Sequence, residues 1–181
     1  MARDAERQAT VVAFAGTLGL SMLLAACKDE PWEVIGVVPP ANAAAAFAQL
    51  HSSMGTTADE VLIPTLDRVE VCAELTDGTH LIGEAEISQG KPGASIQRVF
   101  LIAGPTLPRP SQPVGRTDFR PTPEVLEAVS RADAIVIGPG SLYTNLIPTL
   151  LIKEINEAIR QSAARKIFVC NLMTQPNQTE G

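Results

Sequence analysis

The chain has 181 residues, which suits one domain or one domain with a small subdomain. Its 45% hydrophobic content is typical of a globular protein with a core and excludes disorder of the whole chain. A net charge of −6 argues against an extended nucleic-acid-binding surface, although it allows the binding of a single nucleotide. Three scattered cysteines, Cys27, Cys72 and Cys170, do not suit a disulfide framework and predict reduced, mostly packed thiols in a cytoplasmic protein.

The N-terminal stretch supports two interpretations. Residues 8–27 carry no charge and are long enough for a signal peptide or a membrane span, and the small residues before Cys27 are typical of a lipoprotein cleavage site. Alternatively, a buried strand at 11–15, a glycine turn and a helix at 20–28 explain the same residues. The second interpretation is favoured because residues 1–7 hold two basic and two acidic side chains, and so lack a net positive charge.

The next segment predicts a second strand and a helix. A β-branched run at 33–38 reads as a buried strand, which Pro39 and Pro40 stop because proline donates no ladder hydrogen bond. An alanine-rich stretch at 41–50 predicts a helix, followed by a loop at 51–57.

An antiparallel insertion is predicted over residues 61–102. Apolar residues alternate along 68–75 and again along 81–87, with Asp77-Gly78 between the two runs as a hairpin signal. A third strand at 96–101 extends this patch, which has one face in water. The solvent-facing positions include Glu70 and Glu74, which we interpret as a solvated face rather than a catalytic carboxylate pair.

A proline-rich segment without periodicity follows at 103–123 and predicts a linker or an extended surface loop. At its end, Thr122 is predicted to cap a helix that has Pro123 at its first position and runs to Arg131.

The C-terminal third predicts a βαβ unit. A short apolar run at 134–137 is typical of a strand that is buried on both faces, and a glycine-rich loop follows it at 138–145. A helix at 148–164 and a strand at 166–170 complete the unit, with Cys170 expected in the core.

Three loops leave the carboxyl ends of predicted parallel strands, where open α/β sheets bind ligands: 16–19, 138–145 and 171–176. Glycine lets backbone approach a phosphate, and hydroxyl and amide groups can hydrogen-bond phosphate or ribose. Tight turns whose hydroxyls only cap the next helix explain the same composition equally well. The predicted ligand-binding residues are Gly16, Thr17, Gly19, Gly138, Gly140, Ser141, Leu142, Tyr143, Thr144, Asn171, Met173, Thr174 and Gln175.

The ligand hypothesis depends on one geometric expectation. The backbone around Ser141 and around Thr174 must meet at a common crevice that can hold a pyrophosphate. No catalytic residue is identified, and His51 and His80 lack the spacing to Cys or Asp that a metal site needs.

At these loops the chain resembles a known family. Residues 132–144 and 169–176, with their Gly-Pro-Gly-Ser-Leu-Tyr-Thr and Asn-Leu-Met-Thr-Gln-Pro motifs, are similar to YvcK-type gluconeogenesis factors of the CofD-like (2-phospho-L-lactate transferase) family. Residues 62–101 match the same family in order, and residues 11–24 match it more loosely.

The resemblance implies a Rossmann-like α/β fold in a cytoplasmic bacterial protein. It implies a nucleotide ligand such as UDP-N-acetylglucosamine and a regulatory role in growth on gluconeogenic carbon sources and in cell shape. No nucleic-acid or membrane partner is implied, and a homo-oligomer stays open. Two alternatives remain: a magnesium-dependent phosphotransfer enzyme like 2-phospho-L-lactate transferase, and an exported lipoprotein cleaved before Cys27.

The chain departs from the family pattern in three places. Phe14 and Leu18 add bulk beside the first glycine loop, where backbone is expected to approach the ligand. The family's acidic, double-glycine motif does not follow Val38, and the chain stops at Gly181 where relatives continue. The resemblance therefore implies a shortened member whose ligand site lacks at least one wall.

Overall fold

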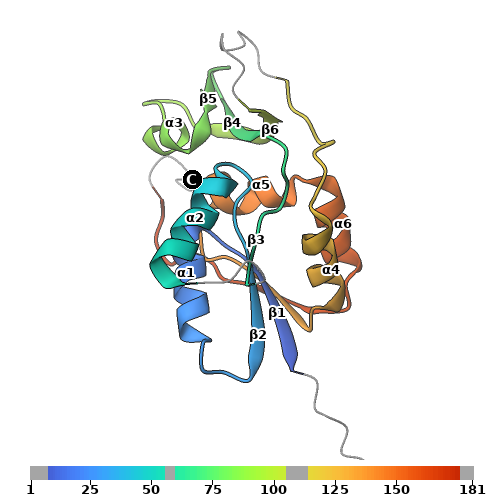
Figure 1. Cartoon of the computed structure of the whole chain (residues 1–181). Coiled ribbons are helices and arrows are strands. Elements are labelled where there is room, and N and C mark those ends of the chain that lie inside the picture. Colours follow the sequence, from blue (N-terminus) through green and yellow to red (C-terminus); the bar gives the residue numbers. More distant parts are fainter. Residues whose placement is uncertain (1–7, 56–59, 105–113, 176–181) are drawn as a thin grey trace, which may run out of the picture.

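The computed structural model of the chain describes residues 8–55, 60–104 and 114–175. Its main sheet has five parallel strands in the order β3-β2-β1-β7-β8, with β1 at the centre (Figure 1). This mostly parallel α/β sheet with an added antiparallel unit confirms the predicted fold class. The strands are β1 (Ala9–Phe14), β2 (Trp32–Val37), β3 (Val61–Leu62), β7 (Ala134–Ile137) and β8 (Arg165–Phe168).

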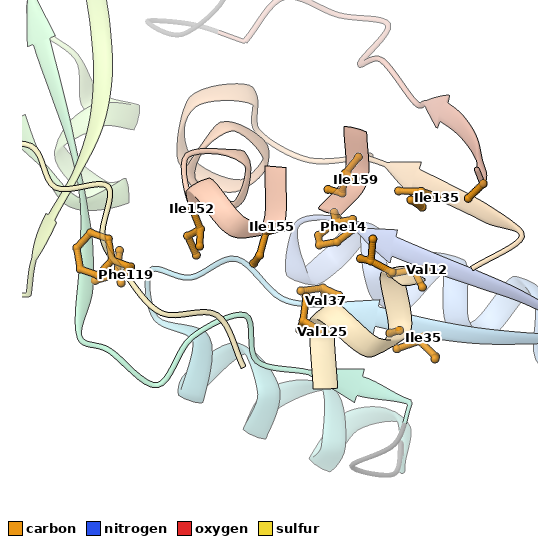
Figure 2. Close-up of a cluster of buried hydrophobic side chains, with 14 of the residues drawn as sticks. Val12, Phe14, Ile35, Val37, Phe119, Val125, Ile135, Ile152, Ile155 and Ile159 are labelled. Carbon is orange, nitrogen blue, oxygen red and sulfur yellow. The ribbon is translucent and has the colours of Figure 1, made fainter. Parts of the chain in front are cut away.

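Helices lie on both faces of the parallel sheet (Figure 1). On one face are α1 (Thr17–Ala26) and α2 (Ala43–Met54), and on the other are α4 (Pro123–Arg131) and α6 (Lys153–Gln161). Figure 2 shows the larger core cluster, in which apolar side chains of the strands pack against the second helix pair. The helix residues in it recur at three and four positions, which places them on one face: Val125, Ala128, Val129, Ile155 and Ile159.

The apolar N-terminal stretch folds as a strand, a turn and a helix. β1 ends at Phe14, the chain turns through Gly16, and α1 follows with Cys27 at its C-terminal cap. Val12 and Ala13 are buried at the centre of the sheet. Among the helices of the described ranges, none has both the length and the apolar character needed to cross a membrane. The strand, turn and helix interpretation is therefore the one that the structure shows.

A smaller antiparallel sheet lies beyond the carboxyl ends of the parallel strands (Figure 1). Its strands, in the order β5-β4-β6, are β4 (Val69–Leu75), β5 (His80–Ile82) and β6 (Ile96–Ala103). The predicted turn joins β4 to β5, and Gly78 has the positive φ of +79° that favours glycine there. The insertion begins later than predicted, because Val61 and Leu62 pair with β2 in the parallel sheet.

The predicted strand at 81–87 is wrong after Ile82. Residues Gly83–Gln89 form a short helix, α3, instead. Gly83 adopts φ +83°, which ends the extended backbone, and Glu86 Oε2 accepts the Ile82 N–H at 2.9 Å at the start of the helix. Positions 83 and 87 share a helix face as well as a strand face, so the alternating pattern could not separate the two. Ile87 is fully buried in the helical arrangement.

Asp77 and Lys91 form an ion pair beside the β4–β5 turn, at 2.6 Å. The hydrogen bond from Lys91, and then those from Thr79, lower the pKa of Asp77 from 3.8 to about 2. Because the pKa is lower in the folded state, this carboxylate stabilises the fold above pH 3.8, and the contribution is lost as the pH falls from 3.8 to about 2. We therefore expect Asp77→Asn to flatten the acid dependence of the urea midpoint in that window. An unchanged acid dependence would contradict the expectation.

Two predicted helix boundaries need correction. The alanine-rich helix continues through residues 51–54, which were predicted as loop, while Thr56 and Thr57 lie outside the described residues. The single helix predicted at 148–164 is broken into α5 (Ile147–Leu150) and α6, and a π-helical turn, η1 (Leu142–Leu146), precedes them where a loop was predicted. At the break, Asn156 Nδ2 donates to the Leu150 carbonyl at 2.9 Å. This side chain satisfies a carbonyl that the interrupted helix leaves without its usual partner.

The described end of the predicted linker, residues 114–123, is mostly exposed as predicted, but contacts with the core anchor it. Arg116 N–H donates to the Leu101 carbonyl of β6 at 2.7 Å, and Phe119 is only 2% exposed in the core cluster. Thr122 precedes α4 as predicted, but its hydroxyl donates to the Ile63 carbonyl at 2.6 Å and does not cap the helix. Residues 105–113 of the predicted linker lie outside the described residues.

Part of one sheet face carries an open groove. Apolar residues of β1, β2, β7 and β8 line it, with Leu23 of α1 at its side, around a volume of about 460 Å³. Val136 faces this groove and is half-buried, whereas Ile135 on the opposite face is fully buried. The prediction that residues 134–137 are buried on both faces is therefore right for Ile135 and wrong for Val136.

Candidate functional site

Three loops meet at the carboxyl ends of β1, β7 and β8. These strands are neighbours in the parallel sheet, so the segments that follow them leave the same edge. They are the first loop (residues 15–19), the second loop (138–145) and the third loop (169–175). Pro176, which the sequence assigned to the third loop, lies outside the described residues.

The second loop begins with backbone that passes very close to the third. Gly138 has φ +96°, and its N–H donates to the Phe14 carbonyl at 2.7 Å. A Cβ at Gly138 would stand 2.4 Å from the Val169 carbonyl oxygen. The peptide bond from Gly138 to Pro139 is cis. Only glycine fits the positive φ at position 138 together with the close approach of the Val169 carbonyl.

Glycines also bring the first and second loops together. Gly16 N–H donates to the Pro139 carbonyl at 3.1 Å, and a Cβ at Gly19 would lie 2.3 Å from that same oxygen. A Cβ at Gly140 would lie 2.7 Å from the Gly16 nitrogen. These three glycines are therefore required by loop-to-loop packing, which is a role that needs no ligand.

Side-chain hydrogen bonds tie the second loop to the third. Asn171 Nδ2 donates to the Gly140 carbonyl at 3.1 Å, and Gln175 Nε2 donates to Ser141 Oγ at 3.0 Å. Asn145 Oδ1 accepts the Ser141 N–H at 3.3 Å. The segments around Ser141 and Thr174 thus lie side by side, as the crevice hypothesis requires.

Two adjoining hollows lie between these segments, and together we call them the crevice. The narrower has a volume of about 230 Å³ and the wider about 800 Å³. The narrower is lined by Gly140, Leu142, Leu146 and residues 168–174, and the wider by Ser88, Ser141 and residues 170–175. None of these lining residues carries a charged side chain, so a ligand would meet amides, hydroxyls and apolar groups.

The predicted ligand-binding residues divide into two groups. Seven line the crevice: Gly140, Ser141, Leu142, Asn171, Met173, Thr174 and Gln175. Six do not line either hollow: Gly16, Thr17, Gly19, Gly138, Tyr143 and Thr144. Thr144 is 1% exposed, and its hydroxyl has no hydrogen-bond partner in the part of the chain that the structure describes. Thr144 and the glycines of the second group therefore lie within the packed loops and not on the surface of the crevice.

Two residues of α3 beside the crevice were missed because the sequence predicted a strand at 81–87 and no helix in this region. Ser88 of α3 lines the wider hollow, and Glu84 Oε1 accepts from Asn145 Nδ2 at 3.4 Å. A third correction concerns Cys170, which was expected in the core but is exposed and lines both hollows. The spacing of Gly83 and Ile87 fits a strand as well as a helix, so it gave no separate signal for α3.

Neither of the two bulky residues in or beside the first loop, Phe14 and Leu18, lines the crevice. Phe14 is 2% exposed and points into the core against α4 and α6 (Figure 2). Leu18 is exposed and lines neither hollow. The expectation that both residues crowd the ligand's approach is therefore wrong at this crevice. The Phe14 side chain leaves the opposite side of the strand from Ala13, and Leu18 is directed into solvent.

Two carboxylates of the antiparallel unit, Glu70 and Glu74, were interpreted from the sequence as a solvated face. Glu70 of β4 lies beneath Gly83, and burial raises its pKa although a hydrogen bond from the Val71 backbone lowers it. Glu70 and Glu74 are both half-buried, which corrects the prediction of a solvated face, and Glu74 forms an ion pair with Arg98 at 2.5 Å. In the described ranges no three His, Cys, Asp or Glu side chains are grouped to hold a metal ion.

Comparison with known proteins supports the motif-based resemblance. The chain is 48% identical over 108 residues to the gluconeogenesis factor of Halalkalibacterium halodurans, which covers 60% of this chain and 29% of that protein. It is 40% identical over 107 residues to the gluconeogenesis factor of Bacillus subtilis, covering 59% and 29% of the two chains. The chain thus spans less than a third of the length of these curated relatives.

The fold is shared with a solved structure, and a family model covers most of the chain. A crystal structure of a UPF0052-family protein from Bacillus halodurans superposes with a TM-score of 0.76 at 27% identity, over 96% of this chain and 73% of that one. The model described as 2-phospho-L-lactate transferase CofD matches residues 41–181. This range contains the second and third loops that form the crevice, and the chain therefore belongs to the CofD family.

Proposed function

We propose that this chain is a gluconeogenesis factor that binds a nucleotide sugar of the UDP-N-acetylglucosamine type in the crevice. The observation that carries the proposal is the meeting of the Ser141 and Thr174 segments, which builds a hollow of pyrophosphate size or larger at the carboxyl edge of the sheet. The relatives' name, gluconeogenesis factor, supports a role in gluconeogenesis. The proposed role is regulatory, in growth on gluconeogenic carbon sources and in cell shape. We place this role in the cytoplasm.

Because the residues that line the crevice are uncharged, they favour a ligand that is bound through several hydrogen bonds to neutral groups. The crevice offers amide groups from Asn171 and Gln175 and hydroxyls from Ser141 and Thr174, beside the apolar side chains of Leu142 and Met173. A nucleotide sugar matches this mixture, because its sugar hydroxyls and phosphate oxygens accept or donate hydrogen bonds while its base has an apolar face.

A thermal-shift titration with UDP-N-acetylglucosamine tests the proposal. Ligand at a hundredfold excess over the dissociation constant stabilises the folded state by about 2.7 kcal/mol. We expect Ser141→Ala to reduce this shift, because the variant loses a hydroxyl that lines the crevice. Ser130→Ala is the matched control, since that hydroxyl bonds to the Glu127 carbonyl on α4, and its shift should equal that of the unaltered chain. A folded sample whose melting is unaffected by any uridine nucleotide would refute the proposal.

A second candidate function is magnesium-dependent phosphotransfer, which the matching family model favours. It ranks lower because the residues that line the crevice include no carboxylate. Turnover of a guanylyl-activated donor that requires Mg²⁺ would favour the enzyme over the regulator.

A further inference from the structure

Asn145 connects three segments that are far apart in the sequence. Its Oδ1 accepts the Ser141 N–H at 3.3 Å, and its Nδ2 donates to Glu84 Oε1 of α3 at 3.4 Å. The same Oδ1 would stand 2.6 Å from a Cβ at Gly16. One half-buried carboxamide therefore contacts the first loop, the second loop and the antiparallel unit.

The partners fix which way the carboxamide points. A carboxylate only accepts hydrogen bonds, so Glu84 requires the amide nitrogen of Asn145 on its side. This leaves Oδ1 on the side of the Ser141 N–H, which can only donate. Glu84 thus selects the orientation in which Asn145 holds Ser141 in place.

The hydrogen bonds of Ser141 leave one of its groups, the hydroxyl hydrogen, for a ligand. Its N–H is used by Asn145, and its Oγ accepts from Gln175 Nε2 at 3.0 Å. Because an amide nitrogen can only donate, that contact does not use the hydroxyl hydrogen of Ser141, which can be directed at an acceptor in the crevice. A phosphate or carbonyl oxygen is the ligand atom that suits such a donor.

We propose that Asn145 is a positioning residue for the crevice, oriented by Glu84, and that it aims the Ser141 hydroxyl at an acceptor oxygen of the ligand. The ligand part of this inference rests on the proposed function. The positioning part concerns the free protein and can be measured without a ligand. It also gives α3 a role, since the antiparallel unit then helps to set the geometry of the binding loops.

Exchanging the amide of Asn145 with the carboxylate of Glu84 tests the positioning role of this pair. Asn145→Asp places two carboxylates side by side and removes the donor, so we expect affinity for UDP-N-acetylglucosamine to fall about tenfold. Adding Glu84→Gln restores one amide facing one carboxylate, and affinity should return to within about threefold of the unaltered chain. Asn156→Ala is the control, because its side chain bonds to the Leu150 carbonyl away from the crevice, and it should leave affinity unchanged.

Hydrogen–deuterium exchange of the free protein provides the ligand-independent measurement. We expect faster exchange in residues 138–146 for Asn145→Asp and a return towards the original rate in the double variant. Unaltered exchange in the single variant, or no recovery in the double one, would overturn the positioning role. If the exchange pattern holds but the unaltered chain binds no uridine nucleotide, the proposed function fails and the positioning role stands. Binding by the unaltered chain that is equal in Asn145→Asp would instead overturn the inference alone.

Discussion

Replacing Gly138 by alanine is expected to lower the free energy of unfolding by about 3 kcal/mol. Two effects add at this position. The backbone has φ +96°, where an L side chain is strained, and the new Cβ would stand 2.4 Å from the Val169 carbonyl oxygen. Because that neighbour is backbone, relief requires the strand ends of β7 and β8 to move apart. Urea unfolding measured by circular dichroism gives the difference directly.

Gly78→Ala is the matched control for this variant. Gly78 also has a positive φ, of +79°, but no heavy atom lies within 4 Å of the position of its Cβ. It should therefore show only the conformational cost, about 1 kcal/mol. Equal losses in the two variants would show that the close approach of the two loops contributes nothing to stability.

Phe119→Ala is expected to destabilise the fold by about 3–5 kcal/mol, although the residue lies in a segment predicted as linker. The ring is 2% exposed and belongs to the core cluster that also contains Val69 and Leu101 of the antiparallel sheet and Ile152 before α6. Figure 2 shows it beside Ile152, at the end of the cluster away from the centre of the parallel sheet. Its removal leaves a cavity between the two sheets, which the surrounding backbone cannot fully close.

Val114→Ala in the same segment is the control for Phe119→Ala. Val114 is 78% exposed, so the change should stay within about 0.5 kcal/mol. Urea midpoints and slopes of both variants test the expectation. A small loss for Phe119→Ala would mean that this segment does not hold the antiparallel unit against the parallel sheet.

The central strands and the three loops of the site could be predicted from the sequence, because the patterns that indicate them are local. Short continuous apolar runs predicted β1, β2 and β7, because strands of a parallel sheet bury both faces over most of their length. Glycine and small polar residues after such runs identified the first, second and third loops, since the carboxyl ends of parallel strands share one edge. Seven of the predicted site residues line the crevice for this reason.

The errors arose where a residue pattern fits two structures. The alternation through Ile87 is compatible with a strand, yet Gly83 and the Glu86 carboxylate start a helix there. The proline-rich segment shows no periodicity, so nothing local indicated that Phe119 is buried. Cys170 follows an apolar run, but β8 is the edge strand and its end is open to solvent.

The sequence by itself determined the class of fold, the order of its main elements and the family, because apolar periodicity and loop motifs are local properties of the chain. Only the tertiary structure decided which glycines serve loop packing, that α3 borders the crevice, and that Asn145 joins segments 61 residues apart through Glu84. The physical reason is that these features depend on distances between segments. Such distances are set by the packing of the whole fold, and no stretch of sequence encodes them alone.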